Sequence, residues 1–143
     1  MGGIFAAGNR AMIKPSELTP ATSEVTKRMF EAYFDKSEAA VFTGDAEVGA
    51  AFSALPFDHL LFTGGTQIGK KVMKAASDNL VPVTLELGGK SPVIVDENAD
   101  LSDVAKKVMR GKTMNAGQIC LAPDYLMLPL SLIHISEPTR HRQ

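Results

Sequence analysis

Tryptophan is absent from this chain of 143 residues, and cysteine occurs only once, as Cys120. A single cysteine excludes an internal disulfide and fits a reducing compartment. No apolar run approaches the roughly 20 residues that a membrane-spanning helix needs. The segment 1–15 also lacks the charged start and continuous apolar core of a secretion signal. We therefore expect a cytoplasmic protein that does not enter a membrane.

An excess of charge of either sign is also lacking. The 15 lysines and arginines nearly balance the 16 acidic residues, giving a net charge of −1, and the basic residues are scattered along the chain. This composition argues against nucleic acid or an anionic membrane surface as a partner. The hydrophobic content of 45% is enough for the core of one domain.

The only cysteine ends the segment NAGQIC, residues 115–120. Asn115, Gly117 and Gln118 favour a tight turn rather than a core helix. Such a turn would present the sulfur as a nucleophile, with backbone N–H groups close to a developing oxyanion. The alternative is a small buried apolar side chain, which is the commoner state of a lone free cysteine.

A second segment, LELGGKSP at residues 85–92, contains Glu86. Gly88 and Gly89 follow this carboxylate at the end of an expected strand, where glycines allow a ligand to approach the backbone closely. The alternative is a carboxylate that simply faces water in an alternating strand.

Short apolar runs alternate with amphipathic stretches, which is typical of β-α-β units in a mostly parallel sheet with flanking helices, an α/β fold. The expected strands are residues 11–14, 39–44, 59–64, 81–87 and 92–97. Four helices are expected. The first starts at Thr19 and Pro20, the second runs from the cap Asp45 to about Leu55, the third spans residues 66–80, and the fourth follows Asp100 and spans residues 101–114. The apolar faces expected on three of these helices are Val25, Met29, Ala32 and Tyr33; Ile68, Val72 and Ala75 or Ala76; and Leu101, Val104, Ala105 and Val108.

Two further segments are candidates for ligand binding. Gly64, Gly65 and Gly69 lie between a strand and a helix start, where backbone N–H groups and the helix dipole can meet a phosphate, although an ordinary turn is the commoner outcome. Lys14 and Glu17 have the spacing of an ion pair at a helix start, which is usually solvated.

Together these segments carry a resemblance. LELGGKSP and GQIC, with 34 positions between Glu86 and Cys120, resemble the glutamate and cysteine motifs of the aldehyde dehydrogenase superfamily. KPSELTPAT, LPFDHLLFTGGTQIG and APDY are similar to further segments of that family in the same order. The resemblance covers about residues 4–129 and is greatest to the branch of coniferyl, fatty and aromatic aldehyde dehydrogenases.

The resemblance implies a reaction. Cys120 would add to a small-molecule aldehyde, hydride would pass to a nicotinamide, and Glu86 would activate the water that hydrolyses the thioester to a carboxylic acid. It implies NAD as cofactor, with NADP possible, since a carboxylate such as Glu17 binds a free ribose hydroxyl and repels a 2′-phosphate. The cofactor-binding residues implied are Lys14, Glu17, Gly64, Gly65, Thr66, Gly69, Leu87 and Gly88. No metal is expected.

The resemblance also implies a domain organisation: residues 1–88 as a partial, Rossmann-like NAD(P)-binding domain and residues 89–129 as the beginning of the catalytic domain. Residues 130–143 are expected to be a non-native tail, in which His134 and His141 are incidental. The family's Trp-Asn segment, whose Asn completes the oxyanion hole, has no counterpart in the sequence. We therefore expect a central fragment of a homo-oligomeric protein, with little activity alone. The alternative is a non-catalytic truncated module that binds a nucleotide.

Overall fold

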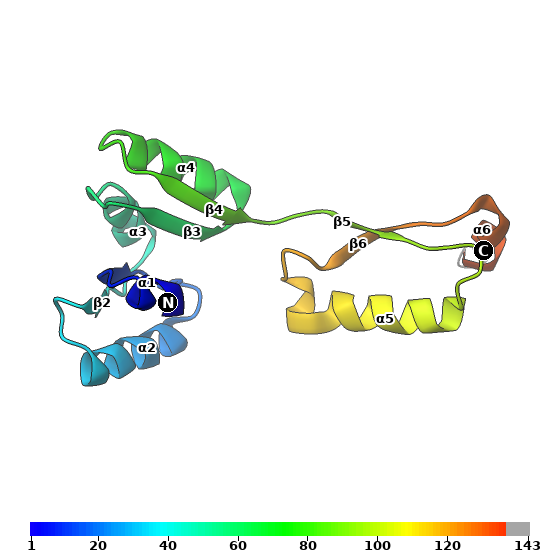
Figure 1. The fold of residues 1–143 in the computed structure, drawn as a ribbon, viewed down its shortest axis with the longest axis horizontal. Helices are drawn as coiled ribbons and strands as arrows, with labels where there is room; N and C mark the ends of the chain where they lie inside the picture. The colour runs from blue at the N-terminus through cyan, green and yellow to red at the C-terminus, as the bar shows by residue number, and fades with distance from the viewer. Residues whose placement is uncertain (137–143) are drawn as a thin grey trace, which may run out of the picture. The chain divides into compact units, whose positions relative to one another are not determined.

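Helices alternate with short strands along the chain (Figure 1). The computed structural model describes residues 1–136, including the side chains as far as residue 133. Of the expected tail, α6 (Leu130–Ser136) is therefore described as backbone, whereas the side chain of His134 and all of His141 lie outside the described residues.

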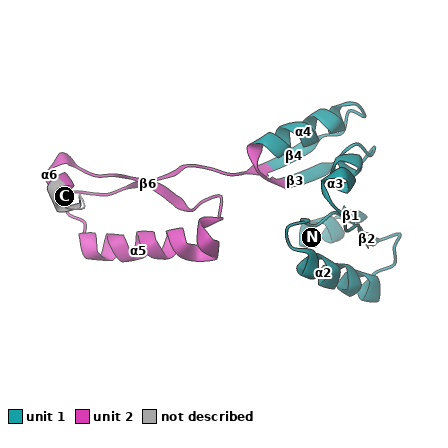
Figure 2. Cartoon of the chain, turned by 180° about the vertical axis from the view of Figure 1, so that it is seen from behind, with its two compact units in different colours: residues 1–62, 67–85 teal, residues 63–66, 86–143 magenta. Residues whose placement is uncertain are grey.

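The chain divides into two compact units (Figure 2). Unit 1 consists of Met1–Phe62 and Gln67–Leu85, and unit 2 consists of Thr63–Thr66 and Glu86–Gln143. The division after Leu85 concerns compactness alone, so the functional boundary between residues 88 and 89 stays a prediction.

Unit 1 begins with a parallel strand pair and a helix between the two strands. β1 (Ala11–Ile13) pairs with β2 (Ala39–Val41), with Ala11 opposite Ala39. The connecting helix α2 (Pro20–Tyr33) starts at Pro20 as predicted, because proline has no N–H to satisfy in a first turn. Phe30 of α2 packs with Ala11, Ala39 and Val41, and α1 (Gly2–Ala6) adds Ile4 and Phe5.

The face of α2 that packs on the strands is not the apolar stripe expected from the sequence. Val25, Met29 and Tyr33 of that stripe are 54%, 51% and 80% exposed, and Ala32 is exposed as well. The buried positions are Ser23 and Phe30. Two aromatic contacts decide the orientation, because the ring of Phe34 stacks on Phe30 at 5.2 Å and on Phe5 at 5.0 Å. Packed aromatic rings bury a large apolar area, which stabilises this orientation of the helix.

The rest of unit 1 forms around a second apolar cluster. It includes α3 (Ala46–Ser53) and most of β3 (Leu60–Gly64), α4 (Thr66–Ser77) and β4 (Val83–Leu87), and β3 pairs with β4. The N–H groups of Glu47 and Val48 donate to the Asp45 carboxylate, which confirms Asp45 as the cap of α3. The buried residues of the cluster are Leu60, Val72, Ala76 and Val81.

One inward position expected on α4 is wrong. Ile68 is 50% exposed, and the buried stripe is formed by Gly69, Val72 and Ala76. Ile68 lies one residue before Gly69, which rotates its side chain by about 100° around the helix axis. The small residue thus meets the sheet and the large one faces outward.

Unit 2 contains a second parallel pair. β5 (Ser91–Ile94) and β6 (Pro123–Met127) align Ser91 with Pro123 and Ile94 with Met127, with one irregularity after Ser91. The connection is α5 (Leu101–Thr113), followed by the short 3₁₀ segment η1 (Met114–Gly117). On the expected apolar face of α5, Ala105 is exposed because it lies at the edge of the stripe, whereas the other three residues are half-buried.

The expected α/β class is confirmed. In the described residues the strands form three separate two-stranded sheets rather than one continuous sheet, and two of the pairs are parallel. None of the helices within residues 1–136 has the length and apolar character needed to cross a bilayer.

Candidate active site

The residues before Cys120 adopt an unusual backbone. α5 ends at Thr113, and Asn115, Ala116 and Gly117 then take φ angles of 49°, 55° and 77°. This left-handed region is free of strain only for glycine, and it costs other residues about 1 kcal/mol or more. The predicted tight turn is therefore present, and it stops the helix before the cysteine.

Cys120 lies in a second turn and is exposed. The N–H of Ala122 donates to the carbonyl of Ile119 at 2.9 Å, so Cys120 and Leu121 are the central residues of this turn. Within residues 1–136, the N–H of Cys120 has no hydrogen-bond acceptor. The alternative of a buried apolar cysteine is therefore wrong.

Glu86 lies in β4, where burial alternates along the strand. Val83, Leu85 and Leu87 are half-buried, whereas Thr84 and Glu86 are exposed. The carboxylate faces outward, as the water-facing alternative expected.

An open groove of about 1130 Å³ brings the two motifs together within unit 2. Three segments line it: residues 63–66, residues 86–90 and residues 117–120. The groove thus contains Glu86 and Cys120. It also contains the expected cofactor residues Gly64, Gly65, Thr66, Leu87 and Gly88.

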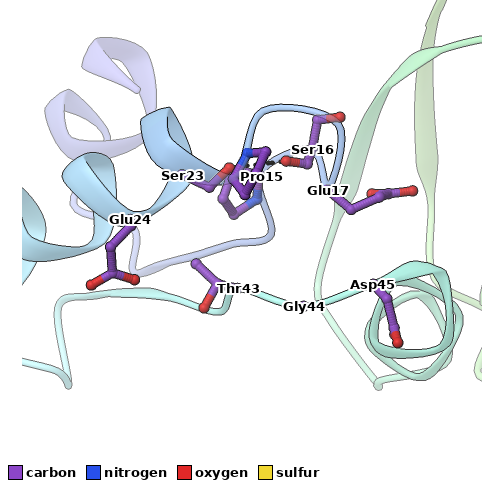
Figure 3. A pocket seen from close by; sticks show the side chains of 9 residues that line it. Pro15, Ser16, Glu17, Ser23, Glu24, Thr43, Gly44 and Asp45 are labelled. Carbon is purple, nitrogen blue, oxygen red and sulfur yellow. Dashed lines mark hydrogen bonds between the residues drawn. The ribbon is translucent and has the colours of Figure 1, made fainter.

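A second, smaller cleft of about 370 Å³ lies in unit 1 (Figure 3). Its lining is Pro15, Ser16, Glu17, Pro20, Ser23, Glu24, Thr43, Gly44 and Asp45. The Ser23 hydroxyl donates to the Ser16 carbonyl at 2.9 Å, as the dashed line in Figure 3 shows, and so fixes the loop that carries Glu17. The cleft therefore lies between the KPSE loop with the start of α2 and the turn that follows β2.

The expected ion pair between Lys14 and Glu17 is present. The Lys14 Nζ donates to the Glu17 Oε2 at 2.6 Å, and the Lys14 side chain is only 11% exposed, against 43% for Glu17. This hydrogen bond is the main reason why the pKa of Glu17 lies below its ordinary value, and the positive charge of Lys14 adds to the effect. Lys14 itself does not line the cleft, but it holds the carboxylate that does.

Gly44 has a steric reason to be glycine. Its φ is 156°, and a Cβ there would lie 2.5 Å from the Val48 Cγ2. Any side chain at this position would therefore push the first turn of α3 away from the cleft.

Sequence reasoning missed part of this cleft. It took Asp45 only as a helix cap, and it did not single out Thr43 or Gly44 as ligand-facing residues. The available signal was the TGD sequence that follows a short strand, which is similar to the TGG sequence at the end of β3. Conversely, Gly69 is buried in α4 and lines neither cavity, so its cofactor role stays a prediction.

In each unit taken by itself, the cavity lining offers groups that suit part of a nucleotide rather than a metal ion. Glu17 offers a carboxylate to hydroxyl groups, and Gly65 and Thr66 lie at the start of α4, where anions are favoured. Residues 1–136 contain no group of three His, Cys, Asp or Glu side chains arranged to hold a metal.

The sequence is similar to known proteins along nearly its whole length. Residues 1–134 match the aldehyde dehydrogenase family. The coniferyl aldehyde dehydrogenase of Pseudomonas sp. strain HR199 is 63% identical over 142 residues, which are 98% of this chain and 30% of that protein. A probable coniferyl aldehyde dehydrogenase of Caulobacter vibrioides is 65% identical over 129 residues, 90% of this chain and 27% of that protein. The chain thus spans less than a third of these relatives.

Solved structures show the same likeness. Staphylococcus aureus AldH in a substrate-bound state has a TM-score of 0.86 at 50% identity, covering 91% of this chain and 28% of that one. A mutant of aldehyde dehydrogenase C from Pseudomonas syringae, in complex with NAD+ and octanal, has a TM-score of 0.83 at 31% identity. It covers 91% of this chain and 27% of the other.

Proposed function

The chain belongs to the aldehyde dehydrogenase family, and from this membership we propose that its protein oxidises an aldehyde to a carboxylic acid with NAD. The observation that carries the proposal is the groove of unit 2. Glu86 and Cys120, 34 positions apart in the sequence, line the same open groove. A nucleophile and a base are thus available to one substrate.

Cys120 is the proposed nucleophile. Its thiolate adds to the aldehyde carbon, forming a carbon–sulfur bond and an oxyanion, which gives a thiohemiacetal. The unbonded N–H of Cys120 is a donor for that oxyanion. NAD, when bound, supplies the acceptor for the hydride that leaves the same carbon, so that Cys120 is left as a thioester.

Glu86 is the proposed general base for the second half of the reaction. Its carboxylate takes a proton from water, the water oxygen bonds to the thioester carbon, and the carbon–sulfur bond breaks. The products are the carboxylic acid and the free Cys120 thiolate. The exposure of Glu86 gives this water direct access to the carboxylate.

The cofactor residues fall into two groups, one in each unit. In unit 1, Glu17 is proposed to accept hydrogen bonds from the adenosine ribose, with Lys14 orienting the carboxylate. A carboxylate there favours NAD, because it repels the 2′-phosphate of NADP, although a single negative charge still allows NADP to bind. In unit 2, the backbone of Gly64, Gly65 and Thr66 is proposed to meet phosphate, and Leu87 and Gly88 to face the nicotinamide. Gly69, just beyond, would let the first turns of α4 pack closely on the sheet.

The proposed substrates are aromatic or long-chain aldehydes. The two relatives from Pseudomonas and Caulobacter are named as a coniferyl aldehyde dehydrogenase and a probable one, and the structure of the Pseudomonas syringae enzyme contains octanal. We also propose a cytoplasmic location and a homo-oligomeric whole protein, in keeping with the single, unpaired cysteine and the family resemblance.

The test is a transplant into a relative. Residues 4–129 replace the matching segment of the Pseudomonas coniferyl aldehyde dehydrogenase, and NADH formation from NAD and coniferyl aldehyde is followed by absorbance. We expect turnover, and we expect Cys120→Ala in the transplant to abolish it. Turnover that survives Cys120→Ala would refute the proposed nucleophile, and a folded but inactive transplant would refute the proposed chemistry.

The alternative function, a non-catalytic nucleotide-binding module, concerns the 143 residues taken alone. We propose that the 143 residues alone give little or no turnover, because the oxyanion would have one donor instead of two. The same absorbance assay on the isolated chain decides this, with Cys120→Ala as control. Cys120-dependent NADH production by the isolated chain would exclude the alternative.

A further inference from the structure

Gly89 and Cys120 approach one another more closely than two side chains would allow. A Cβ built on Gly89 would lie 2.9 Å from the carbonyl oxygen of Cys120, whereas ordinary contacts begin near 3.4 Å. The φ of Gly89 is not in the left-handed region, so alanine fits the backbone conformation there. The requirement for glycine at this position is therefore the contact with the cysteine turn.

The strand that leaves the turn is held from two sides. The Asp124 Oδ1 lies 3.2 Å from the Lys90 Nζ and 3.7 Å from the Lys112 Nζ. Lys90 follows Gly89 directly, and Lys112 lies in the last turn of α5, before η1 and the cysteine turn. Exposed ion pairs are individually weak, but the side chain of Asp124 is only 29% exposed and is shared by both lysines.

The cysteine turn and the strand after it therefore lie against the glutamate segment at two neighbouring points. At the first, the Cys120 carbonyl comes close to the backbone of Gly89, and at the second, Asp124 of β6 pairs with Lys90. Cys120 is a central residue of the Ile119–Ala122 turn, so a shift of its carbonyl rotates the peptide plane that it shares with Leu121 and changes the backbone dihedral angles of Cys120 itself. The sulfur and the unbonded N–H of Cys120 would move with that rotation.

We propose that Gly89 and Asp124 are positioning residues for Cys120. Gly89 has no side chain and so leaves room for the Cys120 carbonyl, and Asp124 connects the strand after the turn to Lys90 and Lys112 by ion pairs. Together they fix the direction of the Cys120 N–H and sulfur relative to the segment that carries Glu86. The consequence for aldehyde oxidation rests on the proposed function, but the positioning itself does not.

Amide hydrogen exchange of the ¹⁵N-labelled 143-residue chain tests this. The reporter is the Ala122 N–H, whose bond to Ile119 closes the turn. We expect Gly89→Ala and Asp124→Asn each to accelerate its exchange about tenfold or more, because local opening of the turn becomes easier. Asp124→Glu keeps the carboxylate and is expected to restore most of the protection.

Two controls separate positioning from general damage. Asp103→Asn removes the carboxylate of the exposed Lys107–Asp103 pair on α5, so it matches Asp124→Asn in chemistry and is expected to leave Ala122 exchange unchanged. Gly88→Ala, measured without cofactor, adds a methyl group where no atom lies within 4 Å, and is also expected to leave it unchanged.

Three results would overturn the inference: an unprotected Ala122 amide in the unsubstituted chain, unchanged exchange in Gly89→Ala and Asp124→Asn, or an equal acceleration of the α5 amides. None of these readouts uses turnover. An inactive transplant would therefore refute the proposed function but not the positioning of Cys120. Unchanged Ala122 exchange would refute the positioning but not the proposed function.

Discussion

Lys90 and Asp124 form an ion pair of 3.2 Å across 34 positions of sequence. The same separation divides Glu86 from Cys120, each four residues earlier in the chain. The cause is the parallel pairing of β5 with β6, which aligns Ser91 with Pro123. Parallel strands enter their sheet at the same edge, so the segments before them meet there. The two motifs therefore share a groove because of strand register.

Replacing Glu86 by glutamine is expected to block hydrolysis but not acylation. In the transplant, Glu86→Gln should give a burst of about one NADH per active site and then a steady rate lowered about 10²–10⁴-fold, the usual contribution of a general base. Rapid-mixing absorbance measures the burst, and mass spectrometry detects the acyl group on Cys120.

The matched control is Glu97→Gln, a carboxylate-to-amide change at an exposed position outside the groove. It is expected to keep the steady rate. Loss of the burst itself in Glu86→Gln would contradict the assigned role, because acylation would then also need the carboxylate.

Glu17 is expected to set the preference between NAD and NADP. Glu17→Gln removes a negative charge from the unit 1 cleft and should raise the ratio of kcat/KM for NADP to that for NAD about tenfold. Steady-state kinetics of the transplant with both cofactors measure the ratio. Glu47→Gln, which lies outside the cleft lining, serves as control, and an unchanged ratio in Glu17→Gln would place the ribose elsewhere.

The titration of Glu17 gives a test that needs no activity. Since the hydrogen bond from Lys14 lowers its pKa below the ordinary 4.5, the carboxylate should stay ionised to a lower pH than in an unfolded chain. Its contribution to stability is present above the unfolded pKa and is lost as pH falls through the lower folded pKa. Carbon NMR of the labelled side chain measures this pKa.

Lys14→Met should return the Glu17 pKa toward its ordinary value. Lys107→Met removes the lysine of the exposed pair on α5 and should leave the Glu17 titration unchanged. An equal response to both variants would mean that overall charge, rather than the 2.6 Å hydrogen bond, governs the shift.

Alanine at position 44 is expected to destabilise unit 1. Gly44→Ala places a methyl group 2.5 Å from Val48 and strains a φ of 156°, so the free energy of unfolding should fall by about 1–3 kcal/mol. Urea denaturation followed by circular dichroism measures the change. Gly3→Ala, in α1 with open space around its Cβ, is the control and should change stability by less than about 0.5 kcal/mol.

Local chemistry in the sequence predicted several boundaries correctly. Pro20 begins α2, Asp45 caps α3 and Asp100 caps α5, because each of these residues satisfies or removes free N–H groups within one turn of its own position. The tight turn before Cys120 was also predictable from local chemistry, since asparagine and glycine, here Asn115 and Gly117, adopt positive φ more readily than other residues.

Burial was harder to predict than helix position. The stripe of Val25, Met29 and Tyr33 has a sound helical spacing but stays exposed, whereas Phe30 is buried through its contact with Phe34. Helical spacing specifies which residues share a face, but the partner of that face depends on distant segments such as Phe5 of α1.

By itself, the sequence determined the α/β class and the family, and it predicted the two residues that carry the chemistry, because these depend on residue type and on spacing along the chain. Tertiary structure alone decided that Glu86 and Cys120 share one groove and that Gly89 meets the Cys120 carbonyl. Both follow from the register between β5 and β6, and register is fixed by packing across the sheet rather than by neighbours in sequence.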